Sequence, residues 1–296
     1  MSSSVLFDSP GPRARSRNVV YSVLGGAAVL ALLVWIVLRL NSKGQFDPAL
    51  WDIFNYAGVR ESIANGIVKT LQAFGLAAVF SLALAVLLAV ARLSEHKPVS
   101  YVATGVIELF RAVPLLITIY LLWQGFFVSD PMWAVVLGLT LYNGAVQAEV
   151  LRAGILAVPK GQAEAAYALG LSKTQVMVTV LVPQAVRSML PTIISQLVVT
   201  LKDTSLGFVV TYEELLKAGQ LLASNTIVDG ENPYVQVVVV TGAIYIAMCL
   251  ALSALAHWVE RRGRRAKTGI AVAHTDMTEA PEGPDATGDQ SAGKAL

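Results

Sequence analysis

Six long apolar stretches constrain what this chain can fold into. The hydrocarbon core of a bilayer is about 30 Å thick, and a helix needs roughly 20 apolar residues to cross it. Segments of this kind lie at approximately 19–40, 63–91, 99–127, 132–157, 186–210 and 233–258. The chain is 55% hydrophobic and 14% charged, with a mean hydropathy of +0.62, which excludes the class of soluble globular proteins. We therefore predict an all-α membrane protein with six transmembrane helices.

The first apolar stretch, 19–40, follows several arginines and could be taken for a signal peptide. Its run of about 20 apolar residues exceeds the 7–15 of a usual signal, and no small-residue cleavage site follows it. We expect a retained helix.

The distribution of lysine and arginine predicts the orientation of the helices, because cytoplasmic segments of membrane proteins carry an excess of them. With the N-terminus inside, the inner segments hold fourteen, Arg92 among them, whereas the outer segments hold only Lys43, Arg60 and Lys217, with Arg39 at the boundary. We expect a multi-pass protein with both termini in the cytoplasm. Residues 1–18 would then be a cytoplasmic tail, and 268–296, which have no apolar period, a disordered one.

The longest inner loop, 158–185, has the pattern of two helices joined by a sharp turn. Its first segment, Gln162–Leu169, consists of good helix formers, and Gly170 suits the left-handed position that ends a helix. Ser172 can cap a second amphipathic helix, which we expect Pro183 to end or kink. A helix of about two turns is marginal alone, so either its own bundle or a partner protein must hold it. Alanines facing outward favour a partner.

The loop resembles the EAA motif of ABC importer permeases. It has "EAA" at 164–166, Gly170 after three intervening residues, and "VLVP" at 180–183. The phrases "ELFRAVPLL" at 108–116, "PQAVRSMLP" at 183–191 and "KDTSL" at 202–206 narrow the resemblance to permeases for polar amino acids, over 61–262. The family usually has Gly and then Thr or Ser before Pro114, whereas this chain has Ala112 and Val113.

That resemblance implies a type I importer core of five helices, here with 19–40 as an extra N-terminal helix, in a bacterial plasma membrane. It implies that the loop is a coupling helix docking on a separate ATPase, with Glu164, Ala165, Ala166, Gly170 and Pro183 as docking residues. The implied partners are two ATPase subunits carrying ATP and Mg, a second permease subunit and an extracellular binding protein. Glutamate permease subunits of high-GC Gram-positive bacteria have a similar N-terminal extension, which favours an acidic amino acid as the substrate.

Charged residues inside the apolar stretches suggest a second site, because burying a charge in a bilayer costs about 2.5–3.5 kcal/mol. Glu108 and Arg111, and likewise Glu149 and Arg152, have the spacing i, i+3 that lets a pair share one helix face. The second pair lies near the cytoplasm, as an interfacial anchor. Arg111 and Lys202 both fall about 18 Å from the inner ends of their helices. We therefore expect a substrate passage lined by Glu108, Arg111, Asn143, Gln147, Lys202, Asp203 and Thr204. The alternative is that these groups only join helices.

Other kinds of site find little support in the sequence. The single Cys249 and the scattered His96, His257 and His274 do not form a pattern of metal ligands, so we expect no metal. "GDQSAGKA" in the C-terminal tail lacks the Ser or Thr and the preceding strand of a phosphate-binding loop. We therefore expect a permease without a nucleotide site or enzymatic activity of its own. An ion-coupled secondary transporter and a membrane scaffold remain as alternatives.

Overall fold

The computed structural model describes residues 11–265, and the chain there is helical, apart from an isolated bridge between Val228 and Glu231. In chain order the elements are α1 (Pro12–Asn41), the 3₁₀ helix η2 (Pro48–Asn55), α2 (Ala57–Arg92), α3 (Lys97–Ala112), α4 (Leu115–Phe126), α5 (Pro131–Leu156), α6 (Lys160–Ala168), α7 (Lys173–Gln175), the π helix η3 (Val176–Leu181), α8 (Val182–Asp203), the 3₁₀ helix η4 (Thr204–Val210), α9 (Leu215–Asn225) and α10 (Tyr234–Arg265). Five helices within this part are long and apolar enough to span a membrane, and the bent pair of α3 and α4 would add a sixth if it crosses the membrane as one span. The predicted fold class is confirmed.

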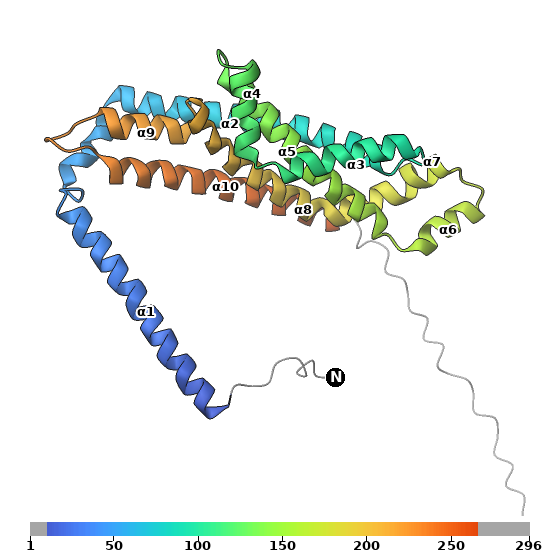
Figure 1. The fold of residues 1–296 in the computed structure, drawn as a ribbon, viewed down its shortest axis with the longest axis horizontal. Helices are drawn as coiled ribbons and strands as arrows, with labels where there is room; N and C mark the ends of the chain where they lie inside the picture. The colour runs from blue at the N-terminus through green and yellow to red at the C-terminus, as the bar shows by residue number, and fades with distance from the viewer. Residues whose placement is uncertain (1–10, 266–296) are drawn as a thin grey trace, which may run out of the picture.

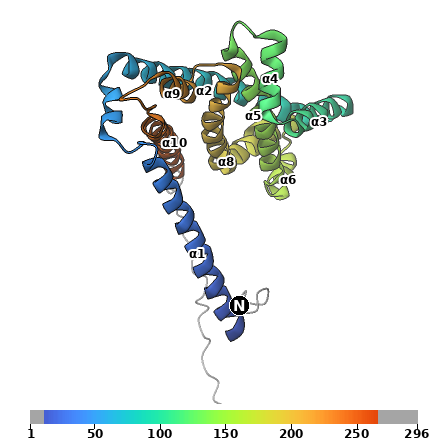
Figure 2. The same ribbon diagram turned by 60° about the vertical axis from the view of Figure 1, so that its left-hand side comes forward.

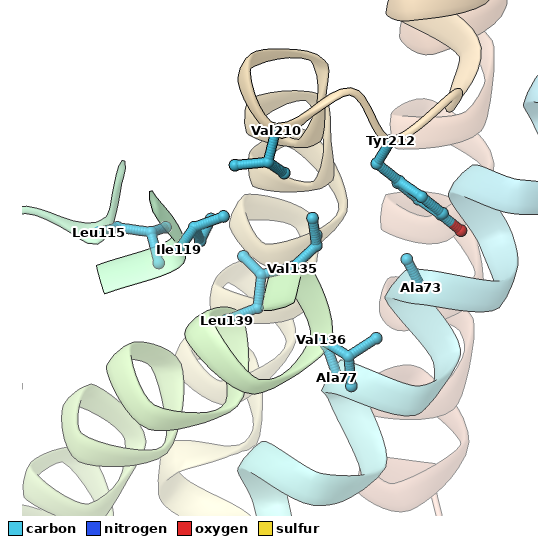
Figure 3. Close-up of a cluster of buried hydrophobic side chains, with 9 residues drawn as sticks. All are labelled: Ala73, Ala77, Leu115, Ile119, Val135, Val136, Leu139, Val210 and Tyr212. Carbon is cyan, nitrogen blue, oxygen red and sulfur yellow. The ribbon is translucent and has the colours of Figure 1, made fainter. Parts of the chain in front are cut away.

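The bundle is organised around α5, the most deeply buried of these spanning helices (Figure 1). Three glycines of α5 allow close approach of its neighbours, since a Cβ at Gly138, Gly144 or Gly154 would lie within 3 Å of side chains of α4, α2 and α8 respectively. Beside them lies an apolar cluster, drawn in Figure 3, of Ala73, Ala77, Leu115, Ile119, Val135, Val136, Leu139, Val210 and Tyr212. Contacts between small and branched side chains therefore hold α2, α4, α5 and η4 together.

The expected span 99–127 is not one straight helix. α3 ends at Ala112, Val113 is extended, and α4 starts after Pro114 at 99° to α3. Proline disfavours helical geometry at the residue before it and has no N–H to continue the helix. In Figure 1, α4 accordingly crosses the long axis of the bundle, whereas α3 follows it. The depth of 18 Å for Arg111 still lies within α3, but the rest of the span turns aside.

Pro183 does not end the second loop helix, although an end there is one of the two outcomes expected from the sequence. One helical span runs from Lys173 to Val210, with Pro183 in the first turn of α8. The π helix η3 lies directly before it and changes the hydrogen-bond register. At the start of a helix, proline removes only an N–H that has no partner within that helix. The chain therefore continues from the loop into the membrane without a break.

α1 stands apart from the bundle in both views (Figures 1 and 2), and none of its most apolar window is buried. It starts at Pro12, inside the stretch expected as a tail, and residues 1–10 and 268–296 of the expected tails lie outside the described residues. The segment after its C-terminal end is fixed, because the Gln45 side chain hydrogen-bonds to the backbone of Asn232 and Val235, and its backbone carbonyl accepts a bond from the side chain of Gln236. The apolar surface of α1 is therefore available to lipid.

Candidate functional site

The short helix α6 ends in a turn with a left-handed backbone conformation at Gly170, which favours glycine at this position. Gly170 has φ +81°, its N–H donates to the carbonyl of Tyr167 at 2.9 Å, and the N–H of Leu171 donates to that of Ala166 at 3.2 Å. This pair of bonds is the Schellman motif with glycine at C′. The sequence-based prediction for Gly170 is confirmed.

The outward face of α6 differs from the expected one. Glu164 and Ala165 are exposed, but Ala166 is only 5% exposed, so it faces the bundle and packs the helix on η3. The expectation that both alanines face outward is therefore wrong. Tyr167 and Leu169 are 46% and 82% exposed and supply apolar surface in its place. Because α6 is held from one side by its own bundle, its other side is free for a partner.

The second half of the loop is tied down by hydrogen bonds. Ser172 forms a capping box with Gln175: its Oγ accepts from the backbone N–H at 3.4 Å, and its own N–H donates to the Gln175 Oε1 at 2.8 Å. Lys173 forms an ion pair with Glu95 in the connection between α2 and α3. The loop 158–185 is thus joined to the connection between α2 and α3.

Arg92, at the end of α2, links the two charged pairs into one network. Its guanidinium lies 2.5 Å from Glu149 and 3.6 Å from Glu108. Arg111 lies 3.4 Å from Glu108, and the Nε of Arg152 donates to Glu149 at 2.8 Å. The sequence identifies Arg92 only as one of the basic residues of the inner segments and does not predict that it links the two charged pairs. Its signal was position alone, because it is a basic residue at the end of an apolar run.

The other passage residues lie in two settings. Asn143 and Gln147 are fully buried between helices: Asn143 accepts a hydrogen bond from Gln196 of α8 at 2.8 Å, and Gln147 donates to Ser81 of α2 at 3.4 Å. Within residues 11–265, neither Asn143 nor Gln147 forms a hydrogen bond with Arg111.

The group at the end of α8 is more open. Lys202 is exposed and Asp203 half-buried, whereas Thr204 is buried and donates to the carbonyl of Leu201 at 2.7 Å. Within residues 11–265, Lys202 has no hydrogen bond or ion pair, and none joins it to Arg111. The passage stays a prediction.

Glu214 is a buried carboxylate that the sequence reading also missed. It caps α9 by accepting from the N–H groups of Leu216 at 2.9 Å and Lys217 at 2.8 Å, and it accepts from the hydroxyl of Tyr245 in α10. Burial raises the pKa of Glu214, whereas these hydrogen bonds act in the opposite direction. Burial, together with the nearby Glu214 and Asp130, raises the pKa of Tyr212 to about 12. The hydrogen bonds of Glu214 therefore join the start of α9 to α10.

Comparison with known proteins places this arrangement in a family. Residues 81–265 match the binding-protein-dependent transport system inner membrane component. The chain belongs to this family. It is 37% identical to the glutamate transport system permease protein GluD of Corynebacterium glutamicum, over 83% of this chain and 90% of that protein. It is 31% identical to the L-cystine transport system permease protein TcyB of Bacillus subtilis, over 68% of this chain and 86% of that one.

A solved amino acid ABC transporter has the same arrangement, with a TM-score of 0.63 and 29% identity over 71% of this chain and 98% of that one. The MetNI methionine ABC transporter, at 18% identity and a TM-score of 0.58, shares the fold. The resemblance to importer permeases is confirmed. The chain is a transport permease that crosses the membrane several times, and its family favours the ATP-driven class over an ion-coupled transporter.

Proposed function

We propose that this chain forms the transmembrane pathway of an ATP-driven importer for glutamate or another acidic amino acid. The support for the substrate is the similarity to GluD and to the glutamate/aspartate import permease GltK of Escherichia coli, which is 29% identical over 68% of this chain and 92% of that protein. Two ATPase subunits, a second permease subunit and an extracellular binding protein complete the complex. ATP and Mg bind to the ATPases, and this chain has no nucleotide site of its own.

The observation that carries the proposal is the exposed side of α6. Glu164, Ala165, Tyr167 and Leu169 offer one acidic and two apolar side chains around a small residue, on a helix that its own bundle holds from behind. A face of this kind fits a groove in a soluble partner. Because α6 follows α5 after only a few residues, a shift of the ATPase moves the most buried helix of the bundle. Docking at α6 requires this face, and hence both termini, to be cytoplasmic.

Within the subunit, we propose that the substrate passes Arg111 and Lys202. Both side chains are exposed on the single subunit, and an exposed charge inside a membrane needs water or a partner. A second permease subunit that encloses a polar passage supplies both. Asp203 and Thr204 adjoin Lys202 in this proposal, and Glu108 holds Arg111. Asn143 and Gln147 are fully buried, and in this proposal they hold helices together beside the passage.

Reconstitution of the complete complex in vesicles tests both proposals. Glu164→Lys reverses the charge at the centre of the docking face, and we expect it to abolish amino-acid-stimulated ATP hydrolysis. Glu231→Lys makes the same change in the outer loop and is expected to leave hydrolysis unchanged. Normal stimulation in Glu164→Lys, or uptake driven by an ion gradient without ATP, would refute coupling through α6. Wild-type uptake rates in Arg111→Ala and Lys202→Ala vesicles would remove the passage while leaving the coupling intact.

A further inference from the structure

A polar cavity lies between the first half of α2 and α9, away from the docking loop and the charge network. Its volume is about 550 Å³, within the range of about 300–1,000 Å³ that is usual for small-molecule sites. Its polar lining consists of Glu61, Ser62, Asn65, Lys69, Gln72 and Glu213. Figure 1 shows α9 beside this half of α2, at the end of the bundle opposite α6.

The cavity is at the outer mouth of the membrane. α2 has 36 residues and is therefore about 54 Å long, far more than the hydrocarbon core requires. Counting about 30 Å, or 20 residues, back from Arg92 places the outer boundary of the hydrocarbon core near Gln72. Glu61 and Lys69 then lie above that boundary. Water and solutes from the extracellular side reach them without crossing the bilayer.

The walls of the cavity are rigid. A Cβ at Gly66 would lie 3.0 Å from the Cα of Leu215, so only glycine lets α9 approach α2 this closely. The backbone N–H of Leu215 donates to Thr70 at 3.1 Å, and the hydroxyl of Tyr212 donates to the carbonyl of Lys69 at 2.9 Å. The first bond joins α2 to the start of α9, and the second joins α2 to the segment before it. The charged side chains are thus presented from a fixed frame.

The charges in this frame are of both signs and can change partners. The Nζ of Lys69 lies 3.0 Å from Glu213, and the two side chains are 41% and 59% exposed. An exposed pair contributes only about 0–1 kcal/mol, so a ligand can replace it at little cost. Glu61 is exposed and has no hydrogen bond or ion pair with any residue between 11 and 265. One ammonium and two carboxylates therefore line the same space as the amides of Asn65 and Gln72.

We propose that this cavity binds the head group of an α-amino acid on its way into the transporter. Lys69 pairs with the α-carboxylate, while Glu213, released from Lys69, and Glu61 pair with the α-ammonium. Every α-amino acid carries these two charges, so the charged residues of the site recognise the head group. The hydroxyl and amide groups of Ser62, Asn65 and Gln72 contact the side chain of the ligand. The inference rests on the proposed amino acid import, but it uses none of the residues of the docking face or of the predicted passage.

Calorimetric titration of amino acids into the permease–ATPase complex in lipid nanodiscs, without the binding protein, tests this site. L-glutamate, L-glutamine and L-arginine are titrated in turn, and for whichever binds, Lys69→Gln and Glu61→Gln should each raise the Kd about ten- to a hundredfold, as expected for a lost charged hydrogen bond. Lys217→Gln is the matched control, because Lys217 carries the same charge on α9 but binds Gln220 outside the cavity. The decarboxylated analogue 4-aminobutanoate should not bind.

Each outcome separates this site from the coupling proposal. Unchanged Kd values in Lys69→Gln and Glu61→Gln, or no binding of any amino acid to the wild-type complex, would overturn the site. If the two variants instead weaken only the affinity for the binding protein, the cavity is a docking surface for that protein and the inference fails. Basal ATP hydrolysis shows that the variant complexes are folded. The Glu164→Lys complex should retain amino acid binding even though its hydrolysis is no longer stimulated.

Discussion

Replacing Gly170 by alanine should loosen α6, the proposed docking helix, without creating any steric clash. No atom lies within 4 Å of the position that a Cβ would take, so the effect comes from the backbone alone. At φ +81° an L-residue with a Cβ is disfavoured by about 1–2 kcal/mol. α6 has nine residues and cannot resist this change through its own hydrogen bonds. The population of the open, unwound helix should therefore rise about 5- to 30-fold.

Gly161 offers an internal control in the same helix. It lies in the first turn of α6, has ordinary helical geometry, and has equally open space around its Cβ position. Alanine there gains up to about 1 kcal/mol of helix propensity, so Gly161→Ala should make α6 open up to about fivefold less often. The same chemical change is thus expected to have opposite signs at two positions nine residues apart.

Amide hydrogen exchange of residues 160–171 in the assembled complex measures this opening directly. We expect faster exchange and weaker stimulation of ATP hydrolysis in Gly170→Ala, and slower exchange with full stimulation in Gly161→Ala. If exchange changes in the same direction in both variants, the space around the added Cβ, and not the backbone conformation, determines the effect of alanine on the opening of α6. Faster exchange with unaltered stimulation would mean that an ordered α6 is not required for docking.

Two further predictions concern the network and the buried acid. Arg92→Gln leaves Glu149 and Glu108 with one basic partner each, and a thermal scan should show the free energy of unfolding lowered by about 1.5–3 kcal/mol. Arg187→Gln, at an exposed site without an ion pair in residues 11–265, should change this free energy little. Equal effects of the two variants would contradict the network. Because burial raises the folded pKa of Glu214 above the ordinary value of 4.5, its stability contribution is full below the unfolded pKa and is lost as pH rises through the folded pKa. The melting temperature of wild type relative to Glu214→Gln should therefore fall as pH rises above 4.5, and parallel curves would exclude this titration.

The large features of the fold could be read from the sequence because they depend on local composition. The six apolar stretches, the stop at Gly170 and the cap at Ser172 each follow from residues next to one another in the chain. The structure shows which local rule prevails at positions where two of them favour different outcomes. At Val113 and Pro114 the rule that proline interrupts a helix overrode apolar length, whereas at Pro183 the start of a new helical register overrode the proline. Composition alone does not decide between these outcomes.

The sites were harder to predict because their partners are far apart in the chain. The spacing i, i+3 identified Glu108 with Arg111 and Glu149 with Arg152, and both pairs exist. Their common partner Arg92 is 57 positions from Glu149, and Lys69 is 144 from Glu213. No periodicity within one helix predicts such contacts. They depend on how α2 packs against α5 and α9, which the close approaches at Gly144 and Gly66 determine.

The packing also gives the loop 158–185 two separate connections to the long helices of the bundle. One is covalent, since α6 follows α5 through residues 157–159, and α5 carries Glu149 of the network. The other is the ion pair of Lys173 with Glu95, which reaches the connection between α2 and α3 just beyond Arg92. Both connections therefore converge on the helices that Arg92 joins. A displacement of α6 must either move α2, α3 and α5 together or break charged contacts of the network. Because these contacts are half-buried, breaking them is costly, and moving the three helices together is the less costly response.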